Sequence, residues 1–132
     1  MSEAITEPRS YLTRAHRIIA MRLGNALAPL HHLNSNMRMR VVLMFILVSQ
    51  EDGLTVGELA KRCGVWKTLA SRYLSDLGIT NRHGKPGLGL VTIVQQVYGD
   101  RREKRVYLTE RGLEILWQMR AALTESRPRA RF

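Results

Sequence analysis

The sequence is poor in cysteine, in signal-like segments and in long apolar runs. Cys63 is the single cysteine, which excludes an internal disulfide and suits a reducing compartment. The longest strongly apolar run extends from Val41 to Val48, and this run is too short to cross a bilayer. The opening stretch MSEAITEPRS lacks the apolar core of a secretory signal. We therefore expect a folded cytoplasmic protein without a membrane partner.

Recognisable catalytic motifs are also missing. The chain has no glycine-rich phosphate loop, no nucleophile motif and no carboxylate pair at a marked spacing, so we do not expect an enzyme. Neither cysteine nor carboxylate stands at zinc-like spacing from His16, His31, His32 or His83. We expect no metal and no other cofactor. A regulatory metal site at the histidines and redox sensing by Cys63 are the alternatives.

Negative charge is scarce. Lys and Arg total 21 against 11 Asp and Glu, which leaves a net charge of +10. Half of this excess lies in residues 66–111, with nine basic and four acidic side chains. Such an excess is typical of proteins that bind nucleic acid or an anionic membrane surface. Aromatic residues are only 6% and do not interleave with the basic ones, which disfavours single-strand binding by base stacking.

The length of 132 residues allows one domain with a real core. Apolar residues at spacings of three and four predict a helix with one apolar stripe over residues 10–30. Only three Arg accompany that stripe, which disfavours a membrane-surface helix. Residues 36–49 are apolar nearly all round and predict a buried helix. A last helix is predicted over residues 110–124, with Thr109 as its cap.

Residues 56–75 have the pattern of a helix-turn-helix. Thr55 and Glu58 form a capping-box pattern for a third helix that ends near Arg62, and a fourth helix is predicted over residues 66–77. Small Ala60 suits a close helix crossing, and Gly64 suits a turn with positive φ. The positions expected to be buried between the helices are all apolar or small: Leu59, Cys63, Val65, Ala70 and Tyr73. The alternative is a plain helical hairpin of the core.

The fourth helix carries the predicted reading face. Its exposed residues are Trp66, Lys67, Thr68, Ser71 and Arg72. In a helix-turn-helix the second helix enters the major groove, where an Arg can bond guanine O6 and N7 together. Thr68 and Ser71 suit bases or phosphates, and Lys67 suits a phosphate. The alternative is an ordinary solvated helix face.

A basic hairpin follows this helix. Residues 90–98 and 104–108 predict two antiparallel strands, because they are rich in Val, Ile, Thr and Tyr. The predicted turn between them and the start of the second strand hold Asp100, Arg101, Arg102 and Lys104. Such a wing can place an Arg in an A·T-rich minor groove, with Asp100 aiming it through an ion pair. The alternative is a solubilising turn.

Two stretches carry a resemblance, LTVGELAKRCGVWKTLASRYLSDL and GDRREKRVYLTERG. From about Met37 to Leu123 the chain resembles the MarR family of bacterial winged-helix regulators. The matching positions of the wing motif are Asp100, Arg101, Arg102, Leu108, Thr109 and Gly112. The resemblance implies a mainly α fold with a small antiparallel β-hairpin. It also implies a homodimer, interlocked through its first and last helices, that binds pseudo-palindromic duplex DNA.

The chain departs from the family pattern at two places. Trp66 replaces a capping Ser, and its indole is expected either to pack on thymine methyl groups or to cover the helix end. The loop over residues 80–89 is long and rich in Gly. This loop is expected either to move the wing or to add a contact through Arg82 and Lys85.

These patterns predict a single domain over residues 1–132. Its parts are dimerisation helices at 10–30 and 110–124, a DNA-binding part at 54–109, and flexible ends at 1–9 and 125–132. The Arg-rich tail is either a DNA-grasping arm or a solubilising end. The predicted function is that of a homodimeric, sequence-specific, double-stranded DNA-binding transcriptional regulator, more specifically a repressor. It is expected in the bacterial cytoplasm, associated with the nucleoid, and encoded by a chromosome, phage or plasmid.

Two alternatives stay open, a winged-helix protein-interaction module and an architectural or non-specific DNA binder. The resemblance also implies a small aromatic acid as ligand in some members of the family. No residue of this chain identifies such a ligand, so the sequence leaves it unknown.

Overall fold

A computed structural model describes residues 9–81, 83–125, 127–128 and 131–132. Within these residues the chain forms five helices and three strands. Their order and bounds are α1 (Arg14–Leu33), α2 (Met39–Val48), β1 (Leu54–Thr55), α3 (Val56–Cys63), α4 (Lys67–Leu77), β2 (Val91–Tyr98), β3 (Arg101–Leu108) and α5 (Glu110–Leu123). The expectation of a mainly α fold with a small antiparallel sheet is confirmed.

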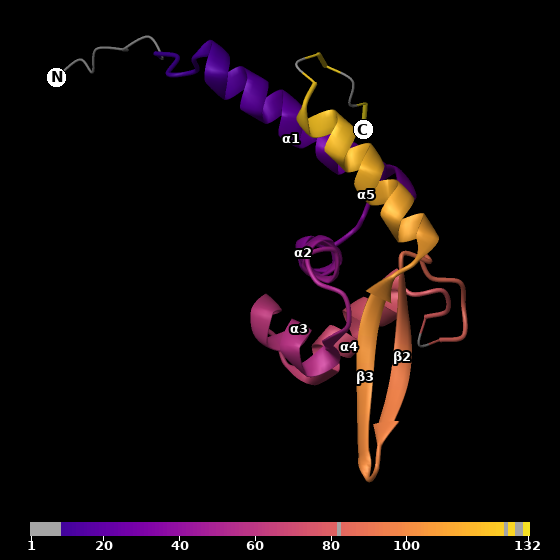
Figure 1. Cartoon of the computed structure of the whole chain (residues 1–132). Coiled ribbons are helices and arrows are strands. Elements are labelled where there is room, and N and C mark those ends of the chain that lie inside the picture. Colours follow the sequence, from indigo (N-terminus) through magenta and orange to yellow (C-terminus); the bar gives the residue numbers. More distant parts are fainter. Residues whose placement is uncertain (1–8, 82, 126, 129–130) are drawn as a thin grey trace, which may run out of the picture.

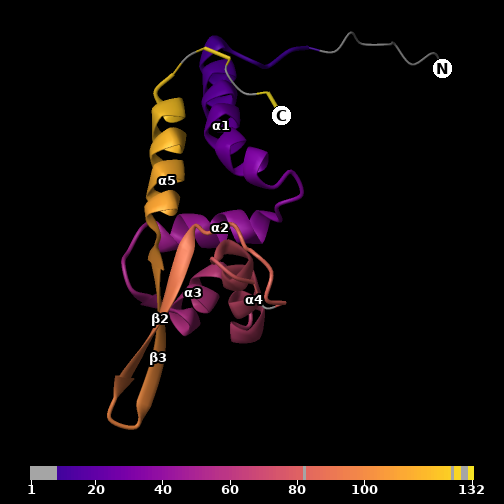
Figure 2. The same ribbon diagram turned by 90° about the vertical axis from the view of Figure 1, so that its right-hand side faces the viewer.

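The molecule has two ends (Figure 1). The helices α1 and α5 pack side by side at one end, although they come from opposite ends of the chain. In the turned view, α2 lies across their base, and α3, α4 and the β2–β3 hairpin extend away beneath it (Figure 2). A two-helix arm is therefore joined through α2 to a helical body with a projecting wing. No helix of the described residues has the length and apolar content needed to cross a membrane.

The core of the body forms where α2, α3 and α4 meet the base of the sheet. Its largest fully buried side chains come from these elements, from the end of α1 and from the residue before β2: Phe45, Leu30, Met44, Leu59, Leu74, Leu77, Leu90, Val48, Val91 and Val106. Fully burying a Leu or Phe side chain contributes roughly 1.5–3 kcal/mol each. This shared core holds α4 and the base of the wing in a defined relation to each other.

The sheet has one strand more than the sequence predicted. Its order is β1-β3-β2, with antiparallel pairing throughout. Thr55 was expected only as the cap of the third helix. Together with Leu54 it also forms β1, which pairs with β3 through Leu54↔Val106 and Thr55↔Arg105. A strand this short has no alternation of its own, and its partner lies far along the chain, so local sequence carries no signal for it.

The two strands of the wing, β2 and β3, stay paired up to the turn that joins them. Tyr98 is opposite Arg101, so the turn consists of Gly99 and Asp100 alone, with Gly99 at φ 59°. The second strand was predicted to start near Lys104 and instead starts at Arg101. A two-residue loop that opens with a positive-φ glycine lets the ladder continue to the end of the hairpin. The wing arginines therefore stand on a paired strand, where their direction alternates from face to face.

Helix caps explain most element bounds. Thr55 accepts a hydrogen bond from the Glu58 backbone N–H at 3.1 Å, which confirms it as the cap of α3. The Glu58 carboxylate accepts a hydrogen bond from the Thr55 hydroxyl at 3.1 Å. In a capping box it would instead accept from the Thr55 backbone N–H, so this half of the predicted motif differs. Helix α1 begins at Arg14 and not at residue 10, because Thr13 and His16 cap each other's backbone N–H groups.

The described residues of the C-terminal tail lie on α1. The Asn25 side chain donates to the Arg127 carbonyl at 2.9 Å, and a His32 ring nitrogen lies 2.5 Å from the Arg131 carbonyl oxygen. The Phe132 ring meets His31 edge-on, with 5.3 Å between ring centroids. Of the predicted flexible ends, residues 1–8, 126, 129 and 130 lie outside the described residues.

Candidate nucleic-acid interface

The helices α3 and α4 form a helix-turn-helix. Gly64 ends α3 in the left-handed region at φ 70°, as the turn requires. The Val65 backbone N–H then donates to the Ala60 carbonyl at 3.0 Å, which closes the turn. Ala60 is buried at the crossing, and Leu59, Ala70 and Tyr73 are buried between the helices. Cys63 and Val65 are half-buried and pack against the core.

One face of α4 is free of the core. Ala70, Tyr73, Leu74 and Leu77 are buried, and they fix the orientation of the helix. The five residues predicted to form the reading face are all exposed: Trp66, Lys67, Thr68, Ser71 and Arg72. The structure therefore leaves this face open to a partner.

Trp66 stands at the start of α4 without covering it. The residue occupies the N-cap position with an extended backbone, and its side chain makes no capping hydrogen bond. Its exposed fraction is 84%. The expectation that the indole covers the helix end is wrong, because a ring packed over that end would lose most of its exposure. A large apolar ring therefore projects into solvent beside the reading face.

A hollow of about 380 Å³ separates α4 from the wing. Its lining comes from the start of α3, from α4 and from both wing strands: Thr55, Val56, Gly57, Lys67, Ser71, Gln95, Arg102, Glu103 and Lys104. We call this hollow the α4–wing groove. It brings together four of the predicted site residues, Lys67, Ser71, Arg102 and Lys104. The charged residues of its lining are three cations, Lys67, Arg102 and Lys104, and one carboxylate.

The other predicted site residues lie outside this groove. Arg72 lines a second hollow of about 550 Å³, together with Arg38, Asp76 and His83. Thr68 lies exposed on α4. Asp100 and Arg101 stand exposed at the wing tip.

Asp100 does not aim an arginine. Among the described residues of the wing tip, Asp100 forms no ion pair with Arg101 or Arg102. The predicted pairing is wrong because the hairpin turn at Asp100 leaves all three side chains in solvent. The ion pair of the wing lies lower, between Glu103 and Arg105.

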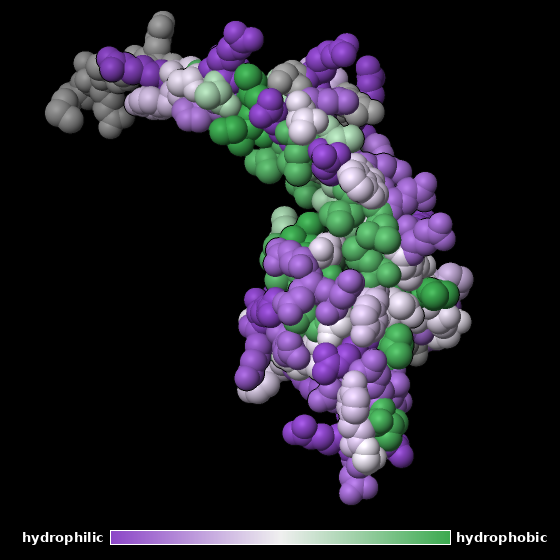
Figure 3. Space-filling model, viewed as in Figure 1, coloured by the Kyte–Doolittle hydropathy of each residue, from purple (hydrophilic) through white to green (hydrophobic). Residues whose placement is uncertain are grey.

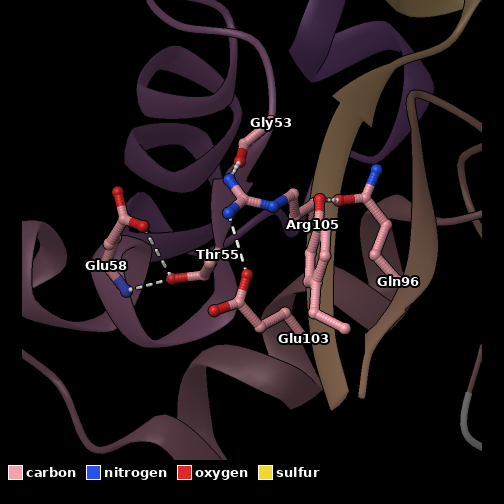
Figure 4. A network of polar contacts seen from close by, with 7 residues as sticks. Gly53, Thr55, Glu58, Gln96, Glu103 and Arg105 are labelled. Carbon is pink, nitrogen blue, oxygen red and sulfur yellow. Dashed lines mark hydrogen bonds and ion pairs between the residues drawn. The ribbon is translucent and has the colours of Figure 1, made fainter. Parts of the chain in front are cut away.

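This lower pair fastens the wing to the body (Figure 4). One guanidinium nitrogen of Arg105 donates to Glu103 Oε2 at 2.8 Å, and another donates to the Gly53 carbonyl at 2.8 Å. The Glu103 carboxylate raises the pKa of Arg105 above its ordinary value by accepting this hydrogen bond. The sequence interpretation missed the pair, although residues two apart on a strand share one face.

The loop before the wing is anchored by its own backbone. Thr80 pairs with Pro86 in an isolated bridge, and the Asn81 side chain accepts from the His83 and Lys85 backbone N–H groups, at 3.0 Å each. Lys85 is exposed, and Arg82 lies outside the described residues. The loop thus closes on itself beside α4.

Apolar side chains remain uncovered on the two-helix arm (Figure 3). Those on α1 are Ile19, Leu23 and Leu27, and those on α5 are Leu113, Trp117 and Leu123. The apolar residues of α5 divide into two faces. Ile115, Met119 and Ala122 are buried, whereas Leu113 and Trp117 face solvent. Within the described chain, no three metal-binding side chains gather into a cluster.

These features define a winged helix: a helix-turn-helix, a hairpin wing and a flanking pair of terminal helices. The fold matches the crystal structure of RV1404 from Mycobacterium tuberculosis with a TM-score of 0.61. The two chains are 16% identical, and the match covers 91% of this chain and 78% of that one. Similarity at this level of identity is evidence for a shared fold.

Two further structures resemble the chain more distantly. A MarR-family transcriptional regulator from Silicibacter pomeroyi is 28% identical, with a TM-score of 0.49, and the match covers 82% of this chain and 68% of that one. MepR, a transcription regulator of the Staphylococcus aureus multidrug efflux pump MepA, is 20% identical with a TM-score of 0.49 over 79% and 68%. No protein-family model and no curated protein matches the sequence.

Proposed function

We propose that the protein is a transcriptional regulator that binds double-stranded DNA as a homodimer. The observation that carries this proposal is the α4–wing groove. Lys67 and Ser71 from the exposed face of α4 line it together with Arg102 and Lys104 of the wing. A groove with cations on both walls fits a phosphate backbone that passes between a helix in the major groove and a wing in the minor groove.

The exposed face of α4 is suited to read bases. Thr68, Ser71 and Arg72 are exposed at spacings of three and four, so they stand on one side of the helix. The Arg72 guanidinium can donate to guanine O6 and N7. Trp66, exposed beside them, offers an apolar surface to thymine methyl groups. The proposed roles therefore divide into base reading on α4 and phosphate contact at its start.

The wing is suited to the flanking minor groove. Arg101 and Arg102 follow the two-residue turn directly and are exposed on opposite faces of β3. An inserted Arg senses the narrow, negative groove of A·T-rich DNA. Asp100 has no pairing role in this proposal.

The arm is suited to dimerisation. Ile19, Leu23 and Leu27 on α1 are four residues apart, as are Leu113 and Trp117 on α5, and an exposed apolar patch of this kind marks an interaction surface. A second copy related by a two-fold axis would cover both patches and present two α4 helices to successive major grooves. Such a dimer would repress by occupying promoter DNA in the cytoplasm. In this proposal the arm is formed by residues 10–30 and 110–124, and the DNA-binding part by residues 54–109.

The first test is selection of binding sites from random duplex DNA at two salt concentrations. An enriched inverted repeat, with half-sites about one helical turn apart, is the expected result. Binding that falls steeply with salt but enriches no motif would replace the regulator with an architectural, non-specific binder. Absence of duplex binding at low salt would reject the proposal and favour a protein-interaction module.

A further inference from the structure

Glu103 is out of place in a surface that binds DNA. It is the one acidic side chain among the nine residues that line the α4–wing groove. A free carboxylate at the edge of this groove would repel the phosphate groups of DNA. The groove can serve DNA only if this carboxylate is neutralised and held in place.

Arg105 does both. Glu103 and Arg105 are two apart on β3, so their side chains leave the same face of the strand. The Arg105 guanidinium donates to the Glu103 carboxylate at 2.8 Å, and both side chains are 31% exposed. Arg102 and Lys104 belong to the other face of β3, which at Val106 is turned into the core against the helices. Glu103 and Arg105 therefore pair on one face of β3, and Arg102 and Lys104 stand on the other.

A second nitrogen of the Arg105 guanidinium is hydrogen-bonded to the turn at Gly53. The Gly53 carbonyl accepts from the guanidinium at 2.8 Å, and the Gly53 N–H donates to the Val106 carbonyl at 3.2 Å. Gly53 is buried at φ 77°, and a Cβ there would come within 3.0 Å of the Tyr107 hydroxyl oxygen. Two successive residues of β3, Arg105 and Val106, therefore form hydrogen bonds with this turn, and the turn fixes where the guanidinium lies.

We propose that Arg105 is a positioning residue that holds the Glu103 carboxylate neutralised at the edge of the α4–wing groove, so that the carboxylate does not repel the DNA phosphates that Arg102 and Lys104 bind. This inference rests on the proposed function. It assigns to Arg105 an effect on DNA that acts through Glu103 and requires no contact between Arg105 and phosphate.

A double-mutant cycle tests the inference. The full-length protein is prepared as wild type, Arg105→Gln, Glu103→Gln and the double variant. Binding to a fluorescein-labelled mixed-sequence duplex of about 30 base pairs, long enough for two half-sites, is measured by anisotropy at low salt. We expect Arg105→Gln to weaken binding about tenfold, Glu103→Gln to leave it equal or tighter, and the double variant to return close to wild type.

The rescue by the second substitution separates the explanations. A direct phosphate contact by Arg105 predicts the same loss in the Glu103→Gln background as in wild type, and that additive result would overturn the inference. A merely structural role predicts a lower melting temperature that follows the affinity, and no rescue. Arg101→Gln is the matched control, because Arg101 lies on the same face of β3 but outside the pair, and its loss should be additive with Glu103→Gln.

Failure of the proposed function gives a different result. If wild type does not bind the duplex at all, both proposals fall. If wild type binds and Arg105→Gln binds equally well, only the positioning role of Arg105 falls.

Discussion

Gly112 stands in the first turn of α5, where the wing passes into the two-helix arm. A Cβ built at this position would overlap the carbonyl group of Leu90 and come within 3.1 Å of a Leu108 methyl group. The obstacle is backbone at the end of the loop before β2, and it cannot move aside as a flexible side chain can. Gly112→Ala should therefore force α5 away from the sheet.

The cost can be worked from the contacts at this junction. Relief of such an overlap in a packed region costs about 1–3 kcal/mol. The shift would also strain the Thr109 cap, which accepts from the Gly112 N–H at 3.0 Å and donates to the Gly89 carbonyl at 2.6 Å. A lost cap costs about 1 kcal/mol. The substitution also adds about 0.5–1 kcal/mol to the free energy of unfolding, because alanine lowers the conformational entropy of the unfolded chain. We expect a net loss of about 2 kcal/mol in the free energy of unfolding.

Gly57 provides the matched control. It also lies in the first turn of a helix, α3, but a Cβ there would meet only the Thr55 hydroxyl at 3.9 Å. Gly57→Ala should therefore stabilise the protein by about 0.5 kcal/mol. The same substitution at two glycines of similar helix position is predicted to act with opposite sign.

The assay is urea unfolding followed by circular dichroism, at one fixed protein concentration because a dimer's stability depends on it. Thermal melts should agree, with roughly 3–5 °C lost per kcal/mol for a chain of this size. If Gly112→Ala proves as stable as wild type, the close contact between α5 and Leu90 does not hold the arm on the body. A loss of stability in Gly57→Ala would contradict the expectation that an alanine side chain fits at position 57 without a clash.

The remaining predictions concern DNA and the dimer. Arg102→Ala should weaken binding mainly where the flank is A·T-rich, and an equal loss on G·C-rich flanks would count against minor-groove insertion. Trp66→Ala should change the unfolding free energy by less than about 0.5 kcal/mol, because the indole is 84% exposed. It should still weaken duplex binding, and unchanged affinity would remove Trp66 from the interface. Trp117→Asp should convert dimers to monomers in sedimentation, whereas persistence of the dimer would place the interface elsewhere.

Much of the body could be predicted from local sequence. Ala60, Gly64 and the caps Thr55 and Thr109 act on their own neighbours, so their roles follow from short-range geometry. The exposed face of α4 likewise follows from helical spacing, and the structure leaves every predicted residue of that face uncovered. What such patterns cannot predict is which of these exposed residues share one groove.

Contacts between distant segments were decided by tertiary structure alone. The strand β1 exists because Leu54 meets Val106, and neither residue carries a local sign of the other. The apolar stripe of α5 divides into a buried and an open face only once α1 packs against it.

The wing shows the same division. Its strands and its basic character are determined by the sequence, since alternating β-formers and charged residues need no partner to be recognised. The ion pairs of its two acidic residues are not determined by the sequence. The exposed turn leaves Asp100 in solvent, whereas the Gly53 turn, from another part of the chain, presents a carbonyl to Arg105. Local sequence determines what each residue can do, and the packing of distant segments decides which partner it meets.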